Sequence, residues 1–213
     1  MSHDDNWLKF GKPSNGQALN PDLPLPDAPI DVVHRSDGSG TTVNFAAYVA
    51  QASGDWSERV GVDTELKWPV GRGVEGSRGM VGAVAAGSGS IGYDEAGQAR
   101  RSGLSIALIE NRAGEFREPS PQAIAAAAAA ADYAGARHFE ILLVGTADPG
   151  AYPIAATVYA LMPRERGSGT ARTLRFFDAA LTRWRRDAID LGYVPLPEEV
   201  VGQIKSYWET SLK

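Results

Sequence analysis

We predict an α/β protein because strand-like and helix-like segments alternate along the chain and glycine-rich turns join several of them. The chain has 213 residues, which allows one large domain or two small ones with a normal hydrophobic core. Its hydrophobic fraction of 43% is typical of a globular protein and too high for general disorder. No run approaches the roughly 18 apolar residues that a membrane span requires.

The N-terminal half begins with an irregular segment and then alternates strand and helix. Residues 1–29 are rich in Pro, Asn and Asp, which predicts an extended arm or linker. Alternating β-branched residues predict a strand over 30–34, and small apolar residues at helical spacing predict a helix over 41–51. Clustered glycines predict loops over 52–79. Three short elements should follow, namely a helix over 80–86 and strands over 90–93 and 104–109.

Helix signals dominate the C-terminal half. Ser120 as N-cap and Pro121 in the first turn predict a helix that ends at Gly135. Three elements are expected after it, namely a β-rich strand over 152–162, an amphipathic helix over 170–191 and a last helix that starts at Pro197.

Composition limits the classes of function. The 21 Lys+Arg and 26 Asp+Glu give a formal net charge of −5, which makes the chain a poor general binder of nucleic acid. Arginines concentrated between residues 164 and 186 fit a solvated helix face, with a docking or anion surface as the alternative. The absence of cysteine excludes disulfides and thiolate sites. The histidines lack partners at metal-ligand spacing, so we expect no metal and no cofactor.

One glycine-rich loop carries recognisable chemistry. The segment reads Val32-Val33-His34-Arg35-Ser36-Asp37-Gly38-Ser39-Gly40-Thr41-Thr42, in which a strand enters the loop and a helix leaves it. A helix start exposes unpaired backbone N–H groups and a partial positive charge. The hydroxyls of Ser39 and Thr41 add donors, and the guanidinium of Arg35 suits an oxyanion. Asp37 repels anions, so its natural role is to pair with Arg35 and orient it.

The spacing of this loop leaves two readings open. It fits an oxyanion site at a helix N-terminus, and it also fits an ordinary strand–helix turn with Ser39 as N-cap. It is neither a P-loop nor a dinucleotide-binding fingerprint, because the required glycine and lysine spacings are absent. Ser39 is not in a nucleophile elbow, so we expect no catalytic residue and no enzymatic activity.

The same loop resembles that of the substrate-binding proteins of phosphate ABC transporters, the PstS family, which carry an Arg-x-Asp-Gly-Ser-Gly-Thr loop. Further motifs of that family follow in order, namely Asn20-Pro21 with Leu25-Pro26, Trp56, Val60-Gly61, Trp68-Pro69-Val70-Gly71, Gly87–Tyr93, Tyr152-Pro153-Ile154, Phe176-Phe177-Asp178, and Leu196-Pro197 with Trp208. The resemblance spans residues 19–213.

The resemblance implies a periplasmic-binding-protein-like (type II) α/β fold with two lobes that close on an anion, one of them near complete and the other partial. It implies that Arg35, Ser39, Gly40 and Thr41 bind inorganic phosphate without a metal. Asp37 would not be one of these phosphate contacts. It would orient Arg35 and could influence which protonation state of the anion is accepted. It further implies an ABC transporter permease as partner and a periplasmic or exported location. The acidic, polar N-terminus of this chain does not read as a signal peptide.

The sequence departs from the family pattern at its start. About a hundred family residues that come before the loop have no counterpart here, including a Ser and an Asp that complete the phosphate cage. The expected organisation is therefore an arm over 1–29, an α/β lobe with the anion loop over 30–150, and a strand and helices of a second, incomplete lobe over 151–213.

Such a protein would expose apolar surface and hold an anion in an open, water-accessible half-cage. We therefore expect a homo-oligomer or a separate chain that supplies the missing lobe. The alternative to phosphate transport is a stand-alone relative that acts as an oligomerisation or partner-binding module, with weak or lost phosphate binding.

Overall fold

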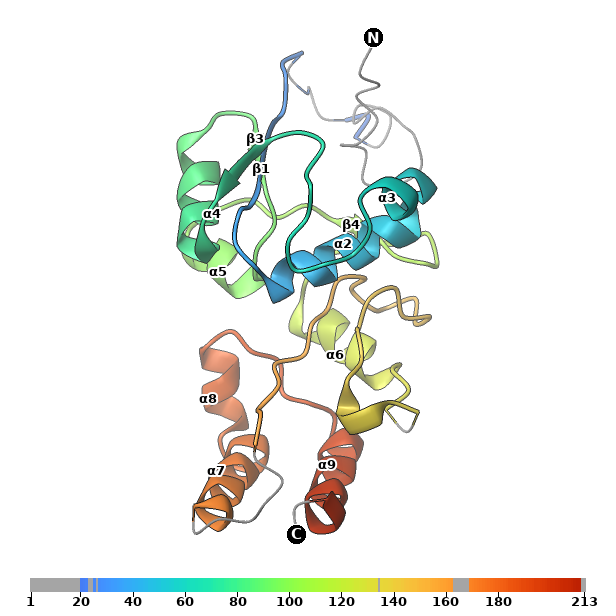
Figure 1. The fold of residues 1–213 in the computed structure, drawn as a ribbon, viewed down its shortest axis with the longest axis vertical. Helices are drawn as coiled ribbons and strands as arrows, with labels where there is room; N and C mark the ends of the chain where they lie inside the picture. The colour runs from blue at the N-terminus through green and yellow to red at the C-terminus, as the bar shows by residue number, and fades with distance from the viewer. Residues whose placement is uncertain (1–19, 23–24, 26, 134, 163–168, 212–213) are drawn as a thin grey trace.

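The computed structural model describes residues 20–22, 25, 27–133, 135–162 and 169–211. Most of the expected arm over 1–29 lies outside these residues, and its described part forms no helix or strand. Figure 1 shows an upper part built around a small sheet and a lower part made of the C-terminal helices, with α6 between them. The chain is thus α/β in its first half and mainly helical in its second.

A three-stranded parallel sheet organises the upper part, in the order β2-β1-β3. Its strands are β1 (Asp31–Arg35), β2 (Arg72–Val74) and β3 (Ser90–Ile91). Helices α2 (Gly40–Ala52) and α3 (Gly54–Arg59) link β1 to β2, and α4 (Gly76–Ala86) links β2 to β3. Helix α4 packs against all three strands, where Met80 is 1% exposed. Strand β1 and helix α2 confirm the two elements predicted around the anion loop.

The region over 52–79 is more ordered than the prediction of loops allowed. It contains α3, β2 and the first residues of α4, which begins at Gly76 and not at residue 80. Strand β2 lies so close to β1 that a Cβ atom at Gly73 would sit 2.9 Å from Cβ of Ser36. Gly73 is one of the clustered glycines that predicted a loop. In the structure, its lack of a side chain permits β2 to lie close to the end of β1.

Short elements follow the sheet. They are α5 (Ala96–Arg101), β4 (Ile109–Glu110), β5 (Phe116–Arg117), α6 (Pro121–Ala129) and a 3-10 turn over Arg137–Phe139. The predicted strand over 104–109 was wrong in extent, since only its last residue enters the antiparallel β4–β5 pair. Ser120 caps α6 as predicted, through a bond from the Ala123 amide. The helix ends at Ala129, because the chain leaves it through a tight turn at Ala130 well before Gly135.

The C-terminal helices are α7 (Thr170–Thr182), α8 (Arg185–Asp190) and α9 (Glu198–Ser211). The single helix predicted over 170–191 is broken at Arg183 and Trp184, and no residue of α7 or α8 is buried. Helix α9 starts one residue after Pro197 and buries Val200 and Val201. The strand predicted over 152–162 is not formed, because only Ile154 takes part in an isolated bridge.

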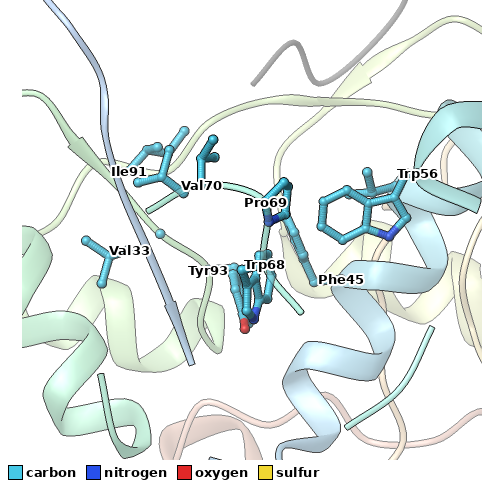
Figure 2. Close-up of a pocket in the computed structure, with 11 residues that line it drawn as sticks. Val33, Phe45, Trp56, Trp68, Pro69, Val70, Ile91 and Tyr93 are labelled. Atoms are coloured by element: carbon cyan, nitrogen blue, oxygen red, sulfur yellow. The ribbon is translucent and has the colours of Figure 1, made fainter. Parts of the chain in front are cut away.

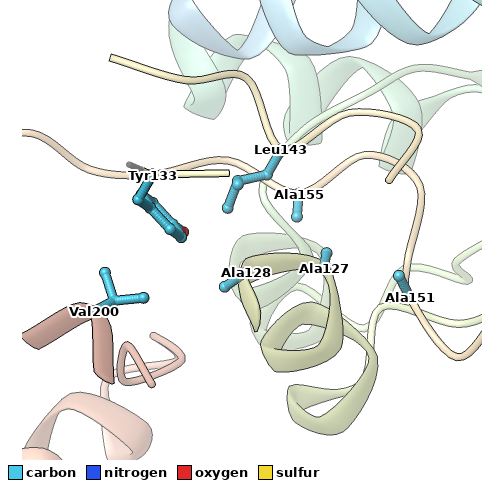
Figure 3. Close-up of a cluster of buried hydrophobic side chains, with 7 residues drawn as sticks. All are labelled: Ala127, Ala128, Tyr133, Leu143, Ala151, Ala155 and Val200. Atoms are coloured by element: carbon cyan, nitrogen blue, oxygen red, sulfur yellow. The ribbon is translucent and has the colours of Figure 1, made fainter. Parts of the chain in front are cut away.

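Two hydrophobic clusters stabilise the molecule. The upper one gathers residues of α2 with Trp56 and Val144. The lower one gathers Ala127 and Ala128 of α6 with Tyr133, Leu143, Ala151, Ala155 and Val200, as Figure 3 shows. Leu143 and Val144 are neighbours in sequence and belong to different clusters. The extended segment that carries them therefore connects the two cores.

Candidate anion-binding site

The carboxyl ends of the three parallel strands bring the candidate site together. Strand β1 leads into the loop over 36–39, β2 into the start of α4, and β3 into Tyr93 and Asp94. Ligand sites of open α/β sheets form at this edge, because loops and helix starts converge there. In Figure 1 the start of α2 lies on the side of the upper part that faces the C-terminal helices.

Arg35 is held in place by Asp37, as the sequence predicted. The Asp37 carboxylate accepts hydrogen bonds from Nε of Arg35 at 2.6 Å and from Nη2 at 2.5 Å. The Arg35 side chain is only 11% exposed. This bidentate pair fixes the plane of the guanidinium and leaves Nη1 for a ligand.

Asp37 also joins the loop to the neighbouring strand–helix unit. Its Oδ1 atom accepts a hydrogen bond of 3.0 Å from the backbone amide of Gly76, the first residue of α4. The bonds from Arg35 and Gly76 hold the pKa of Asp37 well below its usual range. The carboxylate is therefore charged at neutral pH and is engaged by the protein itself.

The predicted residues Ser39, Gly40 and Thr41 form the start of α2. Ser39 is the N-cap, and its Oγ accepts a hydrogen bond of 3.4 Å from the Thr42 amide. The Ser39 amide is already bonded to the carbonyl of Thr64 at 3.1 Å, so its hydroxyl hydrogen is the group left for a ligand. The amides of Gly40 and Thr41 belong to the first turn, where a helix supplies no partner.

Tyr93 is a supporting residue that sequence reasoning did not single out. Its hydroxyl accepts a hydrogen bond of 3.2 Å from the Arg35 amide and lies 2.7 Å from Oγ1 of Thr42. Its ring stacks on Phe45 with centroids 4.5 Å apart, and burial raises the pKa of its hydroxyl. Tyr93 thus ties the end of β1 to the start of α2. The available signal was the family motif Gly87–Tyr93, which ends at this residue.

Two further carboxylates surround the loop. Oδ1 of Asp94 accepts a hydrogen bond of 2.9 Å from the hydroxyl of Ser77, at the start of α4. Glu65 lies over the loop, since its Oε1 would be 3.2 Å from a Cβ atom at Gly38. With Asp37, these groups make the formal charge around Arg35 negative. An anion at this site would therefore depend on directed hydrogen bonds more than on net charge.

Behind the loop lies an apolar pocket of about 40 Å³. Figure 2 shows its lining, which includes Val33, Phe45, Trp68, Ile91 and Tyr93. A wall of this kind offers few donors, so the pocket does not suit a phosphate ion.

Other sequence candidates take structural positions. His34 stacks on Trp68 with ring centroids 4.7 Å apart, which fits a packed strand side chain. The glycines over 71–79 fit either a connecting or surface loop or a second anion cradle by sequence, and the structure instead uses this stretch for β2 and for the amide that binds Asp37. Within the described ranges, no group of three His, Cys, Asp or Glu side chains is placed to hold a metal ion.

Comparison with known proteins places this α/β fold in a class. The chain belongs to the PBP superfamily, since residues 6–178 match the PBP superfamily domain. The mixed α/β architecture with its parallel sheet fits a periplasmic-binding-like fold. No helix in the described part of the chain is long and apolar enough to cross a membrane.

The relatives are phosphate-binding proteins. The chain is 41% identical over 198 residues to the phosphate-binding protein PstS of Xylella fastidiosa strain Temecula1, covering 92% of this chain and 54% of the relative. It is 39% identical to PstS of Haemophilus influenzae, over 92% of this chain and 59% of the relative. It is 32% identical to PstS of Methanocaldococcus jannaschii, over 85% of this chain and 52% of the relative. The resemblance to the PstS family is confirmed, and the chain spans about half the length of the curated relatives it matches.

Proposed function

We propose that this chain binds inorganic phosphate as the substrate-binding component of a phosphate ABC import system. The observation that carries the proposal is the guanidinium of Arg35, fixed by Asp37 beside the start of α2. Arg35, Ser39, Gly40 and Thr41 would donate hydrogen bonds to the phosphate oxygens, and Asp37 would hold Arg35 in position. The names of the relatives, which are phosphate-binding proteins, support this choice of anion.

The proposal includes an organisation and a setting. The fold is of type II, with the anion loop in an α/β lobe over 30–150 and with residues 151–213 in a second, partial lobe. The protein is a binding protein and not an enzyme, and it acts with an ABC transporter permease in the periplasm or outside the cell. These statements rest on membership of the PBP superfamily and on similarity to PstS proteins.

The test is phosphate binding by the 213-residue chain and by two arginine variants. Arg35→Ala removes a charged donor, and hydrogen bonds to charged groups contribute about 1.5–3 kcal/mol. We therefore expect a loss of roughly 10- to 150-fold in affinity, measured by calorimetry with millimolar phosphate. Arg72→Ala is the matched control, because Arg72 forms a similar pair with Asp31 at the opposite end of β1.

Thermal unfolding gives a second readout, since a ligand that binds only the folded chain must raise the midpoint. Phosphate should raise it more than sulfate at the same ionic strength, and Arg35→Ala should remove the difference. An equal rise with both anions, or an equal loss in Arg35→Ala and Arg72→Ala, would contradict phosphate binding at this loop.

A second candidate function is an oligomerisation or partner-binding module with weak or lost phosphate binding. Large apolar side chains exposed in the C-terminal part favour it, namely Val158, Leu161, Phe176, Trp184, Leu191 and Tyr193. A stable dimer or hetero-complex, together with no response of the unfolding midpoint to phosphate, would favour this candidate over the first.

A further inference from the structure

Trp68 is the centre of an aromatic stack next to the anion loop. It belongs to the motif Trp68-Pro69-Val70-Gly71, which the resemblance to the PstS family singles out. The Trp68 ring stacks on His34 with centroids 4.7 Å apart and on Tyr93 with centroids 5.7 Å apart. The planes are close to parallel in both pairs, at 11° and 22°. Figure 2 shows Trp68 and Tyr93 side by side.

The two side chains that stack on Trp68 both bond to the main chain of Arg35. The Arg35 amide donates a hydrogen bond of 3.2 Å to the Tyr93 hydroxyl. Nδ1 of His34 lies 3.1 Å from the Arg35 carbonyl oxygen, and the ring nitrogen is the donor because a carbonyl only accepts. One indole ring therefore supports the partners of both backbone polar groups of Arg35.

Arg35 needs these side chains because one neighbouring strand ends before reaching it. Strand β3 pairs with β1 only at Asp31 and Val32. The Asp31 amide donates to the carbonyl of Gly89 on the β3 side, and every second amide of a strand points the same way. The Arg35 amide therefore points to the β3 side beyond the last paired residue, where the Tyr93 hydroxyl takes the place of a strand carbonyl.

The position of the Arg35 main chain matters for the anion site. Asp37 fixes the plane of the guanidinium, and the aromatic stack fixes the backbone from which that side chain extends. The formal charge around Arg35 is negative, so binding depends on directed hydrogen bonds. Such bonds weaken steeply with misalignment. A shift of the Arg35 backbone should therefore reduce affinity even though every donor is still present.

We propose that Trp68 is a positioning residue of the anion site, which acts through Arg35 by stacking on His34 and Tyr93. This inference rests on the proposed phosphate binding for its effect on affinity. The position of the Arg35 main chain can also be measured without a ligand, so the two proposals can be tested separately.

The first test is phosphate affinity, measured by calorimetry on three variants. Trp68→Leu keeps an apolar side chain but removes the stacked ring, and an aromatic contact contributes enough for a loss of roughly 2- to 12-fold. Trp68→Phe keeps a ring and should retain most of the affinity. Val49→Ala is the matched control, because Val49 is buried in the same hydrophobic cluster and lies outside the stack. It should lower stability and leave affinity unchanged.

The second test is hydrogen exchange of single amides, followed by NMR without phosphate. Trp68→Leu should speed exchange of the Arg35 amide by about tenfold or more. The Ser36 amide is an internal reference, because it donates to the carbonyl of Val74 on the β2 side at 2.9 Å. It should change by less than about twofold, whereas general destabilisation would speed both amides alike.

His34→Phe provides a variant that keeps a ring on Trp68 and removes only the donor to the Arg35 carbonyl. It should weaken phosphate binding less than Trp68→Leu does. Equal acceleration of exchange at Arg35 and Ser36, or equal losses of affinity in Trp68→Leu and Val49→Ala, would overturn the inference. So would equal losses in Trp68→Leu and Trp68→Phe. If the unchanged chain binds no phosphate, the proposed function fails, and selective exchange at Arg35 then decides whether Trp68 positions it.

Discussion

Asp37 connects three parts of the candidate site through one carboxylate. It accepts hydrogen bonds from two nitrogens of Arg35 and from the amide at the start of α4. A carboxylate beside an anion site would normally weaken binding through repulsion. Here its charge is balanced by Arg35 and by the helix start, so its effect is to orient the guanidinium. Asp37 also makes the loop depend on the neighbouring strand–helix unit.

The low pKa of Asp37 predicts how stability changes with pH. Its folded-state pKa lies below the ordinary value of about 3.9, so the unfolded chain binds the proton more readily. The stabilising contribution is therefore fully present above that ordinary value and is lost as the pH falls through the folded-state pKa. The difference in unfolding free energy between the native chain and Asp37→Asn should be constant from pH 5 to 8 and should shrink below about pH 4.

Urea unfolding of both chains at each pH measures this difference and cancels groups that titrate alike in the two. A difference that instead grows on acidification would show that Asp37 is not stabilised as a carboxylate.

Among the helices that the structure describes, α2, α3 and α6 each begin with a serine N-cap, and the caps of α2 and α6 offer a comparison. Ser39 caps α2 through the Thr42 amide, and Ser120 caps α6 through the Ala123 amide. Each serine oxygen satisfies a backbone donor that the helix itself cannot satisfy. The two caps differ in place, since only Ser39 lies in the anion loop. They therefore form a matched pair for separating stability from binding.

Ser39→Ala and Ser120→Ala should each lower the unfolding free energy by about 1 kcal/mol, because each removes an N-cap. Only Ser39→Ala should also weaken phosphate binding, since its hydroxyl is one of the proposed donors. Chemical unfolding and calorimetry on the same samples provide both numbers. Equal phosphate affinity in the two variants would place Ser39 outside the binding site.

Several elements could be predicted because their signals are local. The strand before the anion loop, helix α2 and the start of α6 follow from β-branched alternation, helical spacing and a serine cap. The end of α6, the break between α7 and α8 and the missing strand over 152–162 could not be predicted in this way. They depend on tertiary contacts, above all on whether an extended segment lies beside another strand with which it can form hydrogen bonds.

Across the whole molecule, one extended segment joins two hydrophobic clusters. Leu143 belongs to the lower cluster and Val144 to the upper one, because successive side chains of an extended chain point to opposite sides. The same extended segment therefore contributes one side chain to each hydrophobic cluster. The anion loop adjoins only the upper cluster, so damage to the lower cluster should reduce stability without changing the site.

Ala127 tests this arrangement, since it is fully buried in the lower cluster. Ala127→Leu should overpack the cluster and lower the unfolding free energy by about 1–3 kcal/mol. Phosphate affinity of the folded chain should stay within twofold of the unchanged protein. Denaturant unfolding and calorimetry check both expectations, and a large loss of affinity would mean that the two parts are coupled more tightly than the clusters indicate.

The loop from Arg35 to Thr41 could be predicted from the sequence, because the preceding strand, the glycines, the helix cap and the Arg–Asp pair lie within a few residues of one another. The PBP class was readable as well, since family motifs recur in order along the chain. Tyr93 and the Gly76 amide were not, because β3 and β2 bring them to the loop from 58 and 39 residues away. That the segment over 152–162 forms no strand also emerged only in three dimensions. Strand propensity is a property of a segment, whereas a sheet requires a second backbone beside it.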